Sequence, residues 1–168
     1  IHYGLLFLVF RVSLYILIII IIITVSNAKI CPTDQCSRCD DTMAFCTISD
    51  TSMGIPEEVP ASIPILFITF TGPPQTFSMS LIKRFYRLVA LGLEGNLIGL
   101  ENETLPSHIT DVYIMGTEIE TLPTKLFDGN SNIQILNLAQ NKLRKMPESN
   151  LLQNLKNLRM LDLAQNPI

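Results

Sequence analysis

The 168-residue sequence lacks most of the motifs on which enzyme active sites and metal sites are built. It has only two histidines, His2 in an apolar N-terminal stretch and His108 on a predicted turn, and no recognisable motif pairs either with a nucleophile. A glycine-rich phosphate loop, a His-x-x-x-His spacing and an Asp-rich calcium loop are all missing. Catalysis needs such residue sets, so we expect no enzyme, no catalytic residues, no cofactor and no metal ligands.

Strong charge of one sign is also missing. The sequence carries 12 Lys and Arg against 15 Asp and Glu, a net charge of −3, with no clustered basic face. Nucleic-acid binding needs such a face, so we expect no nucleic acid among the partners. The length suits one domain with a sizeable core. The hydrophobic content of 48% overstates that core, because much of it lies between Ile1 and Val25.

The N-terminal segment 1–28 has the layout of a secretory signal peptide. Arg11 is followed by the apolar run 12–25, which contains six consecutive isoleucines, and then by Ser26-Asn27-Ala28. A basic residue, an apolar region and a small-x-small site define such a peptide, and we place the cleavage after Ala28. The alternative is a signal anchor, because the segment 3–25 approaches the length of a membrane span. In both cases the chain from Lys29 onward faces the secretory lumen or the outside.

Four cysteines lie close together directly after this segment, at Cys31, Cys36, Cys39 and Cys46. An even number behind a secretory signal indicates a disulfide framework, with three pairings open to four cysteines. The alternative is a zinc site, since Cys36-x-x-Cys39 has ligand-like spacing. A zinc site usually has a second Cys-x-x-Cys, and an oxidising compartment favours disulfides.

The remaining sequence contains an internal repeat. The stretch 133–147 has apolar residues and an asparagine in the order Leu-x-Leu-x-x-Asn-x-Leu, and the same apolar and asparagine positions return from Leu161 to Ile168. Earlier copies give five coils in total, and their lengths differ slightly from one coil to the next. The central apolar positions of the five coils are Ile68, Leu91, Val112, Leu136 and Leu161.

Self-similarity of this length and pattern resembles the leucine-rich repeat family, whose repeats are roughly 20–29 residues long. The resemblance implies an α/β-type solenoid, a right-handed coil with a short parallel sheet on its concave face and an irregular or short helical convex side. We expect Asn96, Asn141 and Asn166 to turn the chain after each strand and to bond backbone groups of neighbouring coils. Thr117 should do part of this in coil three, whereas Pro73, at the corresponding position of coil one, has no side-chain donor. The apolar template position after the turn of coil two is Ile98.

The cysteine motif, followed by Ile55-Pro56 and Val59-Pro60, resembles the N-terminal cap of extracellular leucine-rich repeat proteins such as Toll-like receptor ectodomains. The resemblance implies the pairing Cys31–Cys39 and Cys36–Cys46, although two residues separate the middle cysteines here where the usual cap has one. The expected domains are a signal peptide at 1–28, a cap at 29–60 and five repeats at 61–168. Because residue 1 is Ile and Ile168 falls within a repeat, we expect the chain to be truncated at both ends.

The strand residues that alternate with the buried ones must face the other way, on the concave side. Solenoids use this face for extended protein contacts. Its mixed apolar and acidic character suits a protein partner. The candidate protein-binding residues are Phe67, Thr69, Thr71, Glu94, Asp111, Tyr113, Met115, Ile135, Asn137, Met160 and Asp162.

One modification signal is present, since Asn102-Glu103-Thr104 is an N-glycosylation acceptor in the turn region of coil two. Together these features predict a non-enzymatic extracellular protein-binding module, the N-terminal part of a leucine-rich repeat receptor ectodomain. One alternative is a secreted structural or matrix protein, and another is an intracellular zinc-capped adaptor. Membrane attachment would come only from a signal anchor or from a span beyond Ile168.

Overall fold

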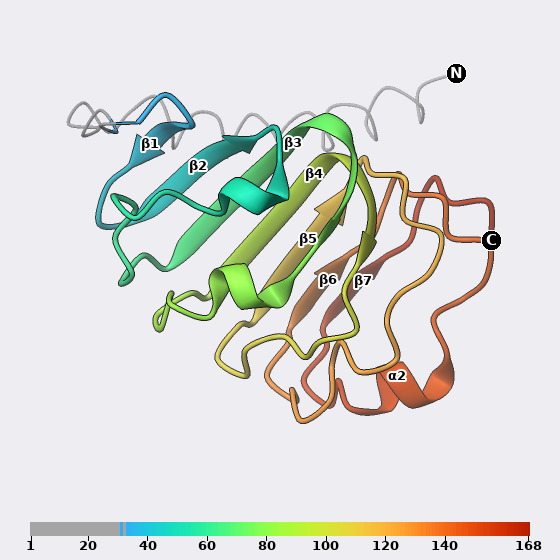
Figure 1. Ribbon diagram of the computed structural model, residues 1–168. Coiled ribbons are helices and arrows are strands. Elements are labelled where there is room, and N and C mark those ends of the chain that lie inside the picture. Colours follow the sequence, from blue (N-terminus) through green and yellow to red (C-terminus); the bar gives the residue numbers. More distant parts are fainter. Residues whose placement is uncertain (1–30, 32) are drawn as a thin grey trace, which may run out of the picture.

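A computed structural model describes residues 31 and 33–168. The predicted signal peptide lies outside the described residues. In the described part, seven strands form one sheet in which spatial order equals chain order (Figure 1). The strands are β1 (Cys36–Cys39), β2 (Met43–Ile48), β3 (Ile65–Phe77), β4 (Ala90–Leu100), β5 (Asp111–Met115), β6 (Ile135–Asn137) and β7 (Met160–Asp162).

Only β1 and β2 are antiparallel, and every later pair is parallel. Parallel neighbours need long crossovers, which each coil supplies as it runs round the far side of the core. These crossovers hold the 3-10 helices η1 (Thr51–Met53) and η2 (Met79–Ile82) and the short helix α2 (Ser149–Gln153). The result is the predicted fold class, a solenoid of about five turns with a parallel sheet on one side and short helical pieces on the other.

The core consists of inward strand residues stacked coil upon coil. Leu91 pairs with Val112, Val112 with Leu136, and Leu136 with Leu161, as the repeat predicts. The first three are fully buried, whereas Leu161 is 37% exposed because β7 has a neighbouring strand on one side only. Phe127 and Ile82 close the outer side of the same core and are also fully buried.

The predicted register of coil one is wrong by two residues. Leu91 pairs with Leu66, and Ile68 pairs with Leu93, so Leu66 rather than Ile68 is the central position. The asparagine position of this coil therefore falls on Thr71 and not on Pro73. Ile65 also faces away from the core, paired with Ala90. A shift of two residues keeps the same side chains on the same face, so alternation does not detect it.

Coil two departs from the template after its turn. Leu97 takes the buried position, and Ile98, the predicted one, is 47% exposed. Gly95, between the inward residues Leu93 and Leu97, has a φ of +90°. Glycine adopts this left-handed conformation readily because it has no Cβ. The strand is redirected there and continues alongside β3, with Leu97 opposite Gln75.

The asparagines bridge neighbouring coils as predicted. The Nδ2 atoms of Asn96, Asn141 and Asn166 donate to the carbonyl oxygens of Gly72 at 2.8 Å, Ile114 at 2.7 Å and Leu138 at 2.8 Å. Asn141 is buried, and its Oδ1 accepts from the backbone N–H of Thr117 at 3.2 Å and from the hydroxyl of the same residue. Thr117 Oγ1 also accepts from the backbone N–H of Ile119 at 3.4 Å, so Thr117 does part of the work of an asparagine in coil three, as predicted.

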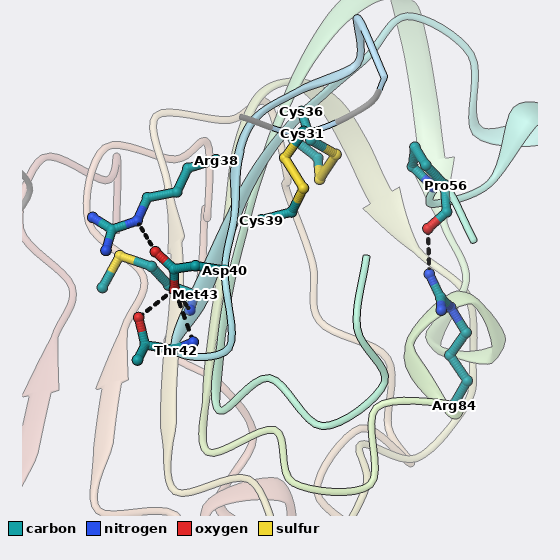
Figure 2. The surroundings of a disulfide bond; sticks show 10 residues. Cys31, Cys36, Arg38, Cys39, Asp40, Thr42, Met43, Pro56 and Arg84 are labelled. Atoms are coloured by element: carbon teal, nitrogen blue, oxygen red, sulfur yellow. Dashed lines mark hydrogen bonds and ion pairs between the residues drawn. A yellow bond between two sulfur atoms is a disulfide. The ribbon is translucent and has the colours of Figure 1, made fainter. Parts of the chain in front are cut away.

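Two disulfides hold the cap, Cys31–Cys39 and Cys36–Cys46, and all four cysteines are buried (Figure 2). This is the pairing that the family resemblance implies, and it leaves no thiol among the four for a zinc ion. The disulfide-linked hairpin β1–β2 also extends the sheet, because β2 pairs in parallel with β3. The cap thus contributes two strands to the sheet, β1 and β2, which the repeat pattern does not predict.

Arg84, in the crossover between β3 and β4, fastens the cap to coil one (Figure 2). Its guanidinium donates to the carbonyl oxygens of Val59 at 2.9 Å and Pro56 at 2.5 Å, and it lies 4.3 Å from the ring centroid of Phe85. Charge-assisted bonds to two carbonyls of one loop fix the position of that loop. Arg84 therefore links residues that the disulfides do not reach.

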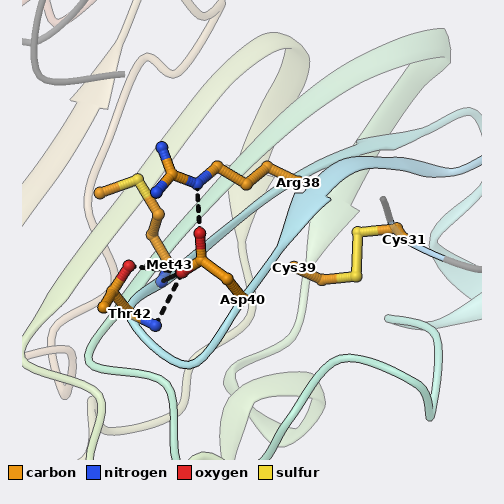
Figure 3. A network of polar contacts seen from close by, with 6 residues as sticks. All are labelled: Cys31, Arg38, Cys39, Asp40, Thr42 and Met43. Atoms are coloured by element: carbon orange, nitrogen blue, oxygen red, sulfur yellow. Dashed lines mark hydrogen bonds and ion pairs between the residues drawn. A yellow bond between two sulfur atoms is a disulfide. The ribbon is translucent and has the colours of Figure 1, made fainter. Parts of the chain in front are cut away.

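A second polar network closes the turn between β1 and β2 (Figure 3). Asp40 accepts from Arg38 Nε at 2.6 Å and from the backbone N–H groups of Thr42 at 2.8 Å and Met43 at 3.0 Å. Burial alone would raise the pKa of Asp40. The bonds from Thr42, Arg38 and Met43 outweigh it and lower the pKa to about 2.

Candidate protein-binding surface

The concave face is defined here by the positions of β2 to β7 that alternate with the buried ones. The parallel registers bring these positions together across adjacent strands. Strand spacing of about 4.8 Å makes a surface roughly 25 Å wide from the six strands. Ten of the eleven candidate residues lie on it, each exposed or half-buried: Phe67, Thr69, Glu94, Asp111, Tyr113, Met115, Ile135, Asn137, Met160 and Asp162.

The corrected register changes the membership of this face. Thr71 is exposed but lies after the last paired face position of β3, which is Thr69 opposite Glu94. Sequence reasoning missed Ile65 for the same reason. It also missed the face residues of β2, which are Met43, Phe45 and Thr47. The alternation of buried Ala44, Cys46 and Ile48 with these residues was the available signal.

Three aromatic rings form a row along this face. The rings of Phe45 and Phe67 stack with centroids 5.3 Å apart and planes within 9°. The rings of Phe67 and Tyr113 lie 6.3 Å apart, although their strands are separated by β4. Gly92 of β4 makes this contact possible, because a Cβ there would lie 2.0 Å from Cδ1 of Phe67. The missing side chain lets Phe67 lie across β4 and reach the next strand but one.

Carboxylates accompany the aromatic row. Glu94 accepts a hydrogen bond from the hydroxyl of Thr69 at 2.7 Å, and Asp111 accepts one from the hydroxyl of Thr110 at 2.6 Å. Burial and the neighbouring charge of Asp111 raise the pKa of Tyr113, so its phenol stays protonated at neutral pH. The centre of the face therefore combines aromatic surface, a phenol donor and two negative charges.

The polar side chains of the last two coils also serve the fold. Asn137 Oδ1 accepts from the backbone N–H of Ala139, and Asp162 Oδ1 accepts from that of Ala164, each at 2.9 Å. These bonds turn the chain after each strand, a use that asparagine and aspartate share. We therefore centre the candidate surface on β2 to β5, where the face residues carry no such turn.

The remaining candidate positions lie apart from this face. Asn102 is exposed in the coil after β4, and its side chain accepts from the backbone N–H of Lys125 at 3.4 Å. His108 is held by a contact of 3.1 Å between its Nε2 and the carbonyl oxygen of Phe85. Over residues 31 and 33–168, no group of three or more metal-ligating side chains comes together. The helices of this same part of the chain are all too short or too polar to cross a bilayer.

Comparison with known families agrees with the geometry. Residues 107–168 match the family model described as leucine rich repeat, a segment that contains β5, β6 and β7. No curated protein matches the chain. Folds of this type are typically scaffolds for protein interaction and not enzymes. The stacked coils, the asparagine bridges and the matched segment identify the architecture as a leucine-rich repeat solenoid.

Proposed function

We propose that this chain is a non-enzymatic extracellular protein-binding module, the N-terminal part of a leucine-rich repeat receptor ectodomain. The observation that carries the proposal is the aromatic row of Phe45, Phe67 and Tyr113 on the concave face. Aromatic residues are enriched where proteins meet, because they supply large contact areas. A surface of this width accommodates one interface of roughly 800 Å² per partner.

The extracellular assignment rests on the cysteines and on the order of the segments. Disulfides persist in oxidising compartments, and both bonds lie in the small N-terminal cap. The proposed domains are a signal peptide at 1–28, a cysteine-rich cap at 29–60 and the repeats at 61–168. Within this proposal Asn102 carries a glycan on an exposed turn, away from the concave face.

A glycan wedge tests the proposal. The variant M115N creates an Asn-Gly-Thr acceptor with Gly116 and Thr117, at a concave position of β5. The control variant K156T creates an acceptor at Asn154, directly after α2 on the convex side. The full chain is secreted from cultured cells and bound to an array of secreted and cell-surface proteins. We expect the concave glycan to abolish binding and the convex glycan to preserve it. Binding that survives the concave glycan would contradict the proposal.

A further inference from the structure

The concave face carries charge of one sign only. Its positions on β2 to β7 include three carboxylates, Glu94, Asp111 and Asp162, and no lysine, arginine or histidine. Within the described residues, none of the three has a basic side chain within 4.0 Å, whereas Glu118 and Glu120 pair with Lys142 and Arg144. Within residues 31 and 33–168, no basic side chain therefore neutralises the negative charge of this face.

Arg38, which is the arginine nearest to this face in the strand register, does not neutralise its negative charge. Arg38 lies on β1 opposite Phe45, but its charge is paired with Asp40 at 2.6 Å and only 6% of the residue is exposed. Elsewhere the acidic and basic residues of the chain are close to balanced, with a net charge of −3 over 168 residues. The three carboxylates of the concave face are thus a local concentration and not a sample of an acidic protein.

The aromatic row lies between the two carboxylates, so one ligand segment can reach all of these side chains, and one ligand group can reach the row and one carboxylate. Gly92 is flanked along β4 by Glu94 and across the sheet by Phe67 and Tyr113, and Asp111 lies two positions before Tyr113. A guanidinium is planar, stacks on aromatic faces and donates in a fork that matches a carboxylate. An ammonium lacks the planar stacking surface, so an arginine fits this arrangement better than a lysine.

From this complementarity we propose that the partner presents an exposed, arginine-bearing segment to the concave face between β3 and β5. Its guanidinium stacks on the aromatic row at Tyr113 and pairs with Glu94, and Asp111, four residues away along the sheet, adds to the negative charge that attracts the segment. The inference rests on the proposed function, since it names the chemistry of the ligand for the same surface. The inference adds that the partner is basic at the point of contact. The attraction between this positive charge and the acidic face would also speed association.

Selection from a random-peptide display library against the full secreted chain tests this inference without knowledge of the partner. We expect enriched peptides to carry arginine, and their arginine-to-lysine versions to bind more weakly. The double variant E94Q/D111N removes two charges and keeps the acceptor oxygens that Thr69 and Thr110 use. It should weaken binding roughly tenfold. The matched control E118Q/E120Q removes the same charge outside the face and should leave binding unchanged.

Each other outcome overturns the inference. Enriched peptides that are neutral or acidic, yet are blocked by the concave glycan, refute the basic partner and leave the protein-binding surface standing. Equal weakening by E94Q/D111N and by E118Q/E120Q shows a general attraction to an acidic protein and refutes the site. Peptides that bind in spite of the concave glycan, or a selection that enriches none, refute the inference and the proposed surface together. Thermal unfolding of both double variants verifies that neither result reflects loss of the fold.

Discussion

The asparagine bridges predict a graded loss of stability when each is replaced by alanine. Asn141 is buried, donates to Ile114 O and Leu138 O at 2.7 and 2.8 Å, and accepts from Thr117. Leu138 O keeps a second donor from Asn166, but Ile114 O and the Thr117 N–H lose theirs. A buried polar group left without a partner costs about 1–3 kcal/mol, so N141A should cost about 3 kcal/mol.

Asn96 and Asn166 make fewer buried bonds, so their replacement should cost less stability. Asn96 is exposed and makes one bridging bond, to Gly72 O, so N96A should cost about 1 kcal/mol. Asn166 is half-buried, donates to Leu138 O and accepts from the backbone N–H of Leu143 at 3.0 Å, so N166A should fall between. The variant N141D keeps the size of the side chain and removes its donors. It should therefore cost at least as much as N141A.

Urea unfolding of the oxidised chain, followed by circular dichroism, measures the series. With a slope of about 2 kcal/mol per molar urea, N141A should lower the midpoint by roughly 1.5 M and N96A by roughly 0.5 M. Equal midpoints for N96A and N141A would refute the reasoning, because burial and bond number would then not decide the cost. A mild N141D with a severe N141A would show that lost volume matters more than lost donors.

Four further predictions test the face, the cap and the glycan. G92A places a Cβ 2.0 Å from the Phe67 ring, so it should separate Phe67 from Tyr113 and cost about 1 kcal/mol of stability. The separation should alter the ring-current shifts of Tyr113 in NMR spectra, and unchanged shifts would contradict this prediction. C31S/C39S opens a disulfide with a sequence separation of 8 and should cost about 2–3 kcal/mol in thermal unfolding. Because the folded pKa of Asp40 is depressed from 3.8 to about 2, the contribution of its carboxylate to stability is present above pH 4 and is lost as the pH falls toward 2. Hydrogen exchange of the β1–β2 turn should show that loss in the wild type and not in D40N. N-glycosidase should lower the mass of the secreted wild type but not that of N102Q, and an unchanged wild-type mass would refute the glycan.

The repeat template predicted coils two to five because their inward leucines contrast with polar neighbours. Coil one offers no such contrast, since apolar residues fill nearly every position of the stretch 63–70. A two-residue shift in that stretch exchanges apolar residues for apolar ones on the same face, so only the paired strand fixes the register. Strand β2 is not predicted for another reason: its inward Cys46 belongs to the disulfide motif, so the alternation around it is not read as a strand.

The aromatic row was beyond sequence reasoning for a geometric reason. Phe45, Phe67 and Tyr113 come from three coils, and the coil between the last two contributes a glycine at the matching position. In the sequence pattern this glycine only indicates that the face has no side chain at that position. In the structure it is the space into which the Phe67 ring leans, so the absence of a side chain creates the contact.

This difference separates the residues that make the fold from those that give it a partner. Template positions are fixed by packing between neighbouring coils, so their substitution should lower the stability of the chain. The concave positions of β2 to β5 point away from this packing, and the template does not specify them. The longest strands, β3 and β4, precede the segment 107–168 that matches the family model. They carry Phe67, Gly92 and Glu94, so the features on which the proposed partner depends lie largely where the chain departs most from its repeat. Isosteric changes there, such as Glu94→Gln, should alter binding while the unfolding midpoint stays the same.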